Sequence, residues 1–226
     1  MLLLNIGNTH TQIAESDGST IGVIRCVPTA SLTAAVIGGR TAAVASVVPE
    51  AAARFEGSGA FFLKREMAAA CGLDLSLVDA STLGMDRLAN AIELRSRHLP
   101  AAALDAGTAI TLEYVDADGR FRGGAIAPGR RLMRRSLAAG TAQLPDLPLL
   151  DTMPGSPGTD TRSSIGFGID RGVIGMVRSW LETIPEAAVY AVGGDAAFFL
   201  KAMPDLIDGG DDFTLRGLLK AWQCCH

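Results

Sequence analysis

Two short turns in this sequence combine small residues with a hydroxyl group and could hold the oxygens of a phosphate. In one of them, an apolar run over 101–104 leads to the carboxylate of Asp105, and a turn at Gly107 precedes Thr108. A glycine turn lets backbone N–H groups approach an anion closely, because no Cβ intervenes. A carboxylate beside such a turn needs a cation, either a metal or a monovalent ion among phosphates. An ordinary tight turn is the alternative, since Asp and Gly are common in turns.

The chain opens with a second copy of this pattern. The apolar run 1–4 leads to Asn5, and a small turn containing Gly7 precedes Thr9. The similarity continues in hairpin signals at 17–18 and 118–119, third strands at 20–25 and 120–127, and later apolar strands at 42–48 and 188–192. This repeat of about a hundred residues predicts two similar lobes with a nucleotide in the cleft between them.

The composition is that of a globular protein and excludes several classes of partner. Hydrophobic residues make up 48% of the 226 residues, charged residues make up 19%, and the net charge is −4. We therefore expect binding neither to nucleic acid nor to a membrane surface. The N-terminus lacks the pattern of a signal peptide, and no apolar run is long enough to span a membrane. The four cysteines show no CxxC spacing, which favours a reducing, cytoplasmic location; the tail 224–226 makes a poor preformed site for a soft metal.

A third candidate for chemistry lies at the start of a predicted helix. Gly84 precedes an amphipathic stretch over 85–97, which places Asp86 and Arg87 in the first helical turn. Anions are favoured at that position, so Asp86 either caps the helix or belongs to a site. The remaining predicted elements are helices at 29–37, 50–56, 130–140, 162–181 and 213–222, and strands at 60–63, 73–78 and 109–114.

Three further segments bear on a ligand or a partner. The helix 130–140 carries four arginines, for which a solvated face is favoured over an anion-binding patch. The proline-rich stretch 144–158 is typical of an ordered loop or lid. Glycines spaced by two to four residues in the helix 162–181 favour close packing against another helix, including one across a dimer. The sequence at 192–195 predicts a strand, a turn and a helix start whose backbone could contact a nucleoside.

Several motifs in order resemble those of one family, the type III pantothenate kinases of the acetate and sugar kinase/chaperone ATPase/actin superfamily. They are NIGNT at 5–9, ASVVP at 45–49, GMDRLANA at 84–91, LDAGTA at 104–109, GGAIAPG at 123–129, TAQLP at 141–145, DT at 160–161 and GGDA at 193–196. The resemblance covers nearly the whole chain. It implies an α/β fold of two ribonuclease-H-like lobes, a duplicated βββαβα unit over 1–99 and 100–226, with an interlobe nucleotide cleft and a homodimeric assembly.

The resemblance also implies a reaction and its residues. The γ-phosphate of ATP passes to the terminal hydroxyl of pantothenate, the first step of coenzyme A biosynthesis, with Mg²⁺ accompanying ATP and K⁺ or NH₄⁺ as a monovalent cation. Asp86 resembles the general base, and Asp105 resembles the ligand of the monovalent cation. The residues that resemble substrate contacts are Gly84, Met85, Arg87 and Thr161, the last one reaching the partner's site. Those that resemble ATP contacts are Asn5, Ile6, Gly7, Asn8, Thr9, His10, Thr11, Gln12 and Thr108.

Two positions depart from the family's pattern. Asn5 stands where the family has an aspartate, so the first turn keeps an acceptor oxygen and loses a negative charge. Leu77 stands where the family usually has a tyrosine, and it cannot donate a hydrogen bond to a substrate. A regulatory relative that binds nucleotide or pantothenate with weakened or no catalysis, and a kinase for another small acid or alcohol, are the alternative hypotheses.

Overall fold

Two five-stranded mixed sheets of the same topology form the framework of the protein. The computed structural model describes all 226 residues. The first sheet contains β1 (Leu2–Ile6), β2 (His10–Glu15), β3 (Arg25–Pro28), β4 (Ala42–Ser46) and β5 (Phe61–Phe62), in the order β3-β2-β1-β4-β5. The second contains β6 (Ala101–Ala106), β7 (Ala109–Val115), β8 (Phe121–Pro128), β9 (Ala188–Val192) and β10 (Ile207–Asp208), in the order β10-β9-β6-β7-β8.

The pairing within the two sheets confirms the internal repeat. The central strands β1 and β6 each pair antiparallel with the next strand and parallel with a strand that follows a long connection, β4 or β9. Chain reversal after β1 and β6 places the two small turns at corresponding ends of the two sheets. The repeat is therefore one of topology as well as of sequence pattern.

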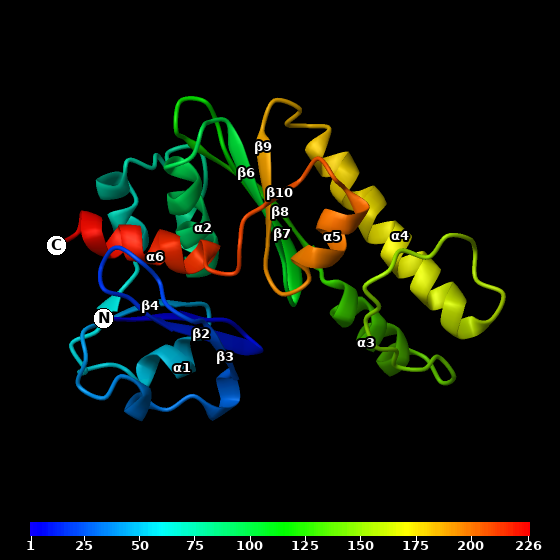
Figure 1. The fold of residues 1–226 in the computed structure, drawn as a ribbon, viewed down its shortest axis with the longest axis horizontal. Helices are drawn as coiled ribbons and strands as arrows, with labels where there is room; N and C mark the ends of the chain where they lie inside the picture. Colours follow the sequence, from blue (N-terminus) through cyan, green and yellow to red (C-terminus); the bar gives the residue numbers. More distant parts are fainter.

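Helices fill three layers around the two sheets (Figure 1). The helices α2 (Met85–Arg95) and α6 (Phe213–Cys224) contribute to a core together with inward-facing residues of both sheets. The outer face of the second sheet is covered by α4 (Thr161–Leu181) and α5 (Ala196–Ala202). The outer face of the first is covered by α1 (Pro49–Ala53) and two 3₁₀ turns, η1 (Thr29–Ser31) and η2 (Ala34–Val36).

The C-terminal helix α6 packs against the first sheet, although it follows the second in the chain. It contacts β1, β4 and α2. The division of the chain into 1–99 and 100–226 therefore stays a prediction, because α6 belongs to the second segment but packs on the sheet of the first.

Three of the predicted elements are wrong in form or place. The segment 20–25 forms one isolated bridge, between Ser16 and Ile21, and becomes a strand only at Arg25, because the amides of Ser19 and Thr20 donate to the carboxylate of Asp17 instead. The predicted helix 29–37 is two 3₁₀ turns, since Thr33 adopts an extended conformation between them.

The predicted strand 73–78 is an irregular segment. It makes one isolated bridge, between Asp74 and Arg120, and then turns as the amide of Ser76 donates to Asp74. Three short 3₁₀ turns, η3 (Arg65–Met67), η4 (Ala69–Cys71) and η5 (Ala80–Thr82), occupy the surrounding chain. The other predicted helices and strands form with ends shifted by a few residues, as expected for boundaries.

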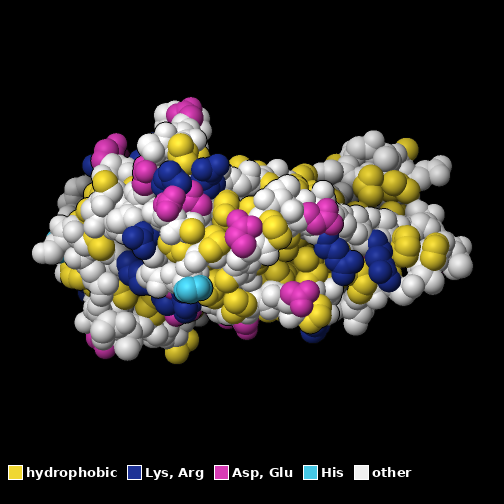
Figure 2. Space-filling model, turned by 90° about the horizontal axis from the view of Figure 1, so that it is seen from above, with side chains coloured by type: hydrophobic (Ala, Val, Ile, Leu, Met, Phe, Trp, Pro, Cys, Tyr) yellow, Lys and Arg dark blue, Asp and Glu magenta, His cyan; other side chains and the backbone are white.

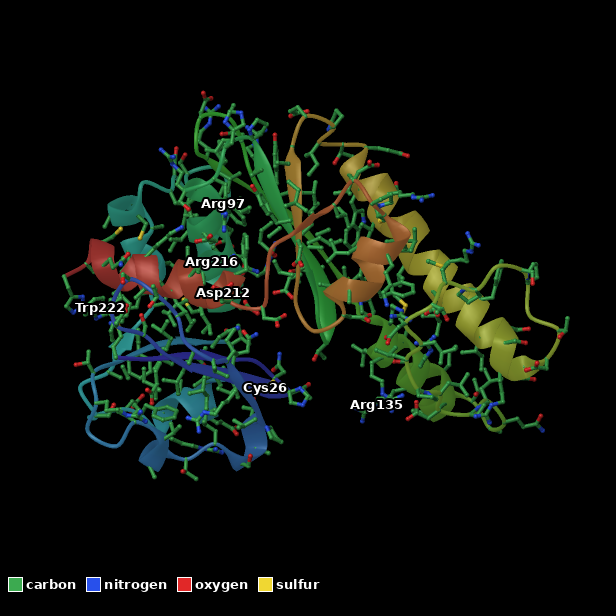
Figure 3. The ribbon with its side chains drawn as sticks, in the orientation of Figure 1. Cys26, Arg97, Arg135, Asp212, Arg216 and Trp222 are labelled. Atoms are coloured by element: carbon green, nitrogen blue, oxygen red, sulfur yellow. The ribbon has the colours of Figure 1, made fainter.

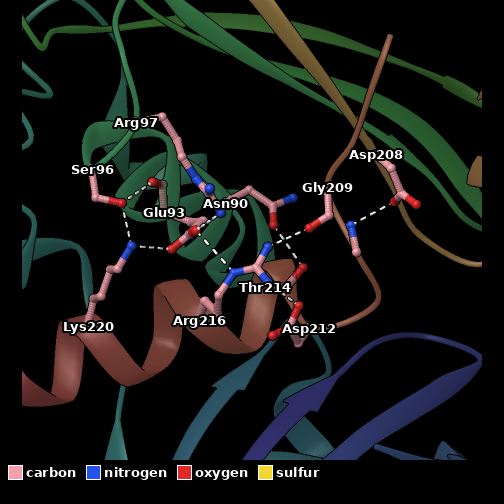
Figure 4. Close-up of polar contacts among 11 residues, drawn as sticks. Asn90, Glu93, Ser96, Arg97, Asp208, Gly209, Asp212, Thr214, Arg216 and Lys220 are labelled. Carbon is pink, nitrogen blue, oxygen red and sulfur yellow. Dashed lines mark hydrogen bonds and ion pairs between the residues drawn. The ribbon is translucent and has the colours of Figure 1, made fainter. Parts of the chain in front are cut away.

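The contact between α2 and α6 is unusually close. A Cβ on Gly217 of α6 would overlap the carbonyl oxygen of Ala89 in α2. The same helices are joined by buried Glu93, whose carboxylate pairs with Arg216 at 3.1 Å and also with Arg97 and Lys220 (Figure 4). The pairing matters because a buried carboxylate without cations is strongly unfavourable.

The surface carries charges of both signs. On the face seen in Figure 2, acidic and basic side chains are interspersed around hydrophobic areas. None of the helices combines the length and the apolar character that crossing a bilayer requires.

We predict that Gly217→Ala lowers the free energy of unfolding by about 2 kcal/mol or more, because the added methyl group must push α6 away from α2. Chemical denaturation measures this change. Gly140→Ala is the matched control: Gly140 ends α3 (Arg130–Gly140), and a Cβ there meets nothing within 4 Å. Equal stability of the two variants would contradict the proposed close contact.

Candidate active site

A cleft of about 410 Å³ lies between the two sheets. Its walls come from the turn after β1, the turn after β6, the turn between β9 and α5, the start of α6 and one side of α3. Figure 3 labels Cys26 on β3 and Arg135 on α3, which line opposite sides of this opening. The sequence predicts an interlobe cleft between the two small turns, and the structure confirms it.

Hydrogen bonds to residues of β2 and η1 support the first turn. The amide of Gly7 donates to the carbonyl of His10 at 3.0 Å, and Thr29 donates its hydroxyl to the carbonyl of Gly7 at 2.7 Å. Thr29 also bonds buried Thr11 through their hydroxyl groups at 3.0 Å. Seven of the predicted ATP contacts line the cleft, namely Thr108 in the second turn and, in or beside the first, Asn5, Gly7, Asn8, Thr9, His10 and Gln12. Ile6 and Thr11 are buried beneath the turn and support it instead.

Asn5 carries an unused acceptor. Its Nδ2 donates to Oε1 of Gln12 at 3.3 Å, whereas its Oδ1 is buried without a hydrogen-bond partner. Gln12 in turn donates from Nε2 to the carbonyl of Asp211 at 3.1 Å, which connects the first sheet to the segment before α6. Amide oxygens are ligands that Mg²⁺ and K⁺ accept. The free oxygen therefore fits a cation, or a water bound to one.

The second turn faces the first across the cleft. The hydroxyl groups of Thr9 and Thr108 lie 3.0 Å apart, which is the direct contact between the two turns. The amide of Gly129 donates to the carbonyl of Thr108 at 2.9 Å, and a Cβ on Gly129 would overlap the carbonyl of Gly107. Gly129 thus brings the start of α3 directly against the turn.

Asp105 lies beside this turn under the β9–α5 connection. Its Oδ2 accepts a hydrogen bond from Nδ2 of Asn90 at 3.2 Å, and the left-handed Gly193, with φ of +89°, leaves room for its Oδ1. The pKa of Asp105 is raised to about 6, chiefly by burial and also by the nearby charge of Asp86, against the lowering effect of the hydrogen bond from Asn90. A buried carboxylate with one amide partner is a suitable ligand for a monovalent cation.

Asp86 lies in the first turn of α2, next to Asp105. Its Oδ1 accepts from the amide of Arg87 at 2.7 Å. Gly84 precedes the helix without a side chain, and a Cβ there would lie 2.7 Å from Oδ1 of Asp86. Burial raises the pKa of Asp86 above its ordinary value, which makes it a stronger base when ionised. Met85 packs its side chain against the core between the sheets.

Arg87 is oriented by a residue that the sequence analysis missed. Its Nε donates to Glu113 at 2.8 Å, and its Nη2 donates to the carbonyl of Leu112 at 3.2 Å. Glu113 is fully buried on β7, and burial raises its pKa to about 7, with Arg87 opposing that shift. Glu113 interrupts the apolar pattern of 109–115, which is the signal that could have identified it.

Asn90 and Thr214 were missed as well. Nδ2 of Asn90 contacts both Asp105 and, at 3.3 Å, Glu113, while its Oδ1 accepts from the hydroxyl of Thr214 at 2.8 Å. Asn90 follows Asp86 by four residues, so both lie on the same side of α2. The spacing of Asn90 from Asp86 could therefore have identified it as a residue of the site. Thr214 in α6 gave no such signal, because its partner is 124 residues away.

Thr161 is not brought to Asp86 within one chain. It begins α4, whose N-cap Asp160 forms a capping box with Ser163, and it lines a separate cavity of about 590 Å³. Leu77 is half exposed in the irregular segment before α2.

The predicted solvated face of α3 is wrong for two of its arginines. Arg130 and Arg134 are buried, and both pair with Asp170 of α4, at 3.0 and 2.9 Å. Arg130 also pairs with Asp195 at 2.8 Å. The acidic partner on a distant helix is what turns this charged side of α3 inward. Arg131 and Arg135 are exposed, as predicted.

The duplicated sheets and the turns that face each other across the cleft define an α/β fold of two similar lobes. Solved structures agree with this fold. A protein of Campylobacter jejuni described as a Baf family transcriptional activator has a TM-score of 0.72 at 16% identity, covering 99% of this chain and 98% of that one. The ethanolamine utilization protein EutJ of Carboxydothermus hydrogenoformans has a TM-score of 0.55 at 13% identity, covering 97% and 88%.

The sequence profile of the type III pantothenate kinase family matches residues 1–183, and the chain belongs to that family. The type III pantothenate kinase of Rhodopirellula baltica is 39% identical over 136 residues, which make up 58% of this chain and 50% of the relative. That of Thermomicrobium roseum is 32% identical over 195 residues, 81% of this chain and 75% of the relative. The chain spans about half the length of several relatives that it matches.

We predict that Asp105→Asn stabilises the ligand-free protein at pH 7.5 but not at pH 4. The pKa of Asp105 is about 6 in the folded protein against an ordinary value of 3.8, so the folded state binds this proton more tightly. Stability is therefore lost as the pH rises from about 4 through 6, and removing the carboxyl restores up to about 3 kcal/mol.

Urea denaturation at both pH values, without K⁺ or NH₄⁺, measures this difference. The control is Asp151→Asn, an exposed carboxylate with no hydrogen-bond partner in the chain, which should change little at either pH. If Asp105→Asn changed the free energy of unfolding equally at both pH values, proton binding by Asp105 would not be the cause of the change.

Proposed function

We propose that this protein is an active pantothenate kinase, which transfers the γ-phosphate of ATP to the terminal hydroxyl of pantothenate. The observation that carries the proposal is the position of Asp86 in the first turn of α2, where its charge acts on Asp105; Asp86 itself is not among the residues that line the cleft, whereas Asp105 is. The hydroxyl proton passes to the carboxylate of Asp86, the alcohol oxygen bonds to the γ-phosphorus, and ADP leaves with the electrons of the broken P–O bond. The ATP phosphates lie between the turns, within reach of Thr9 and Thr108.

Charge in the cleft supports the expected cofactors. Mg²⁺ bound with ATP neutralises phosphate charge, and the free Oδ1 of Asn5 suits it or a water that it holds. Asp105 is proposed to bind the monovalent cation, K⁺ or NH₄⁺, because it is a buried carboxyl with a single amide donor. A bound cation there would stabilise its ionised form.

Arg87 is the proposed partner of the pantothenate carboxylate. Two of its nitrogens are held by Glu113 and Leu112, and Nη1 makes no hydrogen bond within the chain. A guanidinium fixed in this way presents its remaining donor in one direction, which favours a planar carboxylate. Gly84 and Met85 border the same helix start.

A homodimer is part of the proposal. Thr161 lies far from Asp86 in its own chain, and the α4 glycines 166, 168, 172 and 175 have open space where a Cβ would be. This small-residue surface leaves room for a second helix to approach closely. Light scattering tests the assembly; a monomer with full activity would exclude a shared site. We also propose a reducing, cytoplasmic setting, because all four cysteines are free thiols.

ADP release that depends on pantothenate, measured with Mg²⁺ and K⁺, tests the activity directly. We predict that Asp86→Asn lowers kcat by about 10² to 10⁴, because the alcohol loses its proton acceptor. Nucleotide affinity should stay unchanged, since the turns are intact. Asp205→Asn, an exposed carboxylate remote from the cleft, is the control. Turnover near that of the wild type in Asp86→Asn would exclude Asp86 as the base, and nucleotide binding without any wild-type turnover would favour a regulatory role.

We predict that Asn5→Asp tightens Mg²⁺–ATP binding by about tenfold and raises turnover. A charge-assisted contact is worth roughly 1–2 kcal/mol more than a neutral one, and about 1.4 kcal/mol is a factor of ten. Titration calorimetry measures the affinity. Asn8→Asp adds the same charge to the exposed part of the same turn and should weaken binding or leave it unchanged. No change in Asn5→Asp would place the metal elsewhere.

A further inference from the structure

The helix α3 carries two pairs of arginines, each spaced by four residues, and the pairs have different surroundings. Arg130 and Arg134 are buried against Asp170, which fixes the rotation of α3 relative to α4. Arg131 and Arg135 lie on another side of the helix and both line the cleft. Because the first pair is locked, the second pair is held toward the cleft rather than free to turn away.

Within the second pair, only Arg131 has its charge compensated. Its Nη1 and Nη2 contact the carboxylate of Asp146 at 2.7 and 2.8 Å, and Nη1 also donates to the carbonyl of Leu147. Arg135 makes no hydrogen bond or ion pair within the chain. Two like charges four residues apart on a helix destabilise it, so an uncompensated Arg135 gains from an anion in the cleft.

The other charges of the cleft are chiefly negative. The carboxylates lining it are Asp105, Asp195 and Asp211, of which Asp195 is paired with Arg130. A polyphosphate that enters this cleft meets repulsion from the remaining two, and Arg135 is the guanidinium there that has no other partner. Among the side chains that line the cleft, Arg135 is therefore the guanidinium available to pair with a phosphate, in addition to any cation bound with the nucleotide.

The distance along α3 is consistent with that role. Gly129 packs against the Gly107 turn, and Arg135 follows six residues later, about 9 Å along the helix axis. Side chains on a helix point back toward its N-terminus, so the guanidinium extends toward the turn. This reach fits the inner phosphates of a nucleoside triphosphate whose terminal phosphate lies between Thr9 and Thr108.

We propose that Arg135 is a binding residue for the α- and β-phosphates of the nucleotide, acting from the α3 wall of the cleft. This inference rests on the proposed function, because it takes ATP to be the occupant of the cleft. The sequence motifs of the site contain no cationic side chain for those two phosphates, and Arg135 supplies one. Arg135 holds the inner phosphates, while the two turns hold the outer one.

The test is titration calorimetry of the full-length protein with Mg²⁺–ATP and, separately, with inorganic tripolyphosphate. We expect Arg135→Ala to lower the affinity for both ligands by about tenfold to a hundredfold, because a hydrogen-bonded charge pair is lost. The affinity of Arg135→Lys should lie between those of the wild type and Arg135→Ala, because lysine keeps the charge and loses the planar guanidinium group. The matched control is Arg178→Ala, an exposed arginine of α4 outside the cleft, which should bind both as the wild type does.

Two outcomes would overturn the inference while leaving the proposed function in place. Unchanged binding of both ligands by Arg135→Ala would show that the guanidinium contacts neither. Weakened ATP with unchanged tripolyphosphate would assign Arg135 to the nucleoside instead of the phosphates. If the wild type binds neither ligand, the proposed function itself fails, and the inference fails with it.

Discussion

The close packing of α2 against α6 is the constraint on which the rest of the site depends. Gly217 lets the two helix backbones meet at Ala89, and Glu93 of α2 pairs with Arg216 and Lys220 of α6 as well as with Arg97, just after α2. Through this contact the last helix of the chain fixes α2, which carries Asp86 in its first turn. The proposed base is thus positioned by a residue far from it in sequence, and a small displacement of α6 would be transmitted along α2 to the cleft.

A single polar chain continues from that interface into the site. Thr214 of α6 donates to Asn90, and Asn90 donates to both Asp105 and Glu113. Glu113 in turn orients Arg87. The raised pKa values of Asp105 and Glu113 show that burial outweighs the compensation available within the protein. Such unfavourable burial is typical of functional sites, because the missing compensation comes from the ligands.

Much of the fold could be predicted from the sequence, because the strands that carry the turns are strongly apolar and repeat. The turns at Gly7 and Gly107 and the helix start at Gly84 are local patterns, and all of them formed. The strand 73–78 failed because a single carboxylate, Asp74, captured the backbone amide that a strand would have used. Local periodicity cannot show that competition.

The parts of the site that escaped prediction depend on long-range contacts. Glu113 and Asn90 are polar residues in apolar surroundings, but their roles become visible only when α2 lies against β7. Likewise, Arg130 and Arg134 belong to a cluster of arginines for which the sequence alone favours a solvated face. Their burial follows from the ion pairs with Asp170, which lies in another helix. Sequence spacing shows which residues share a helix side, but the partner that makes one side the buried one lies in another element.

The contact between Thr9 and Thr108 indicates how the cleft receives its ligand. These hydroxyl groups close the gap between the two turns at 3.0 Å, in the place where a phosphate group would lie between them. A phosphate must therefore replace one neutral hydrogen bond by contacts from each threonine to charged oxygens. A neutral hydrogen bond contributes about 1 kcal/mol and one to a charged group about 1.5–3 kcal/mol, so the exchange is favourable. Because the two hydroxyl groups are already in contact, a phosphate can lie between them only if the two turns separate.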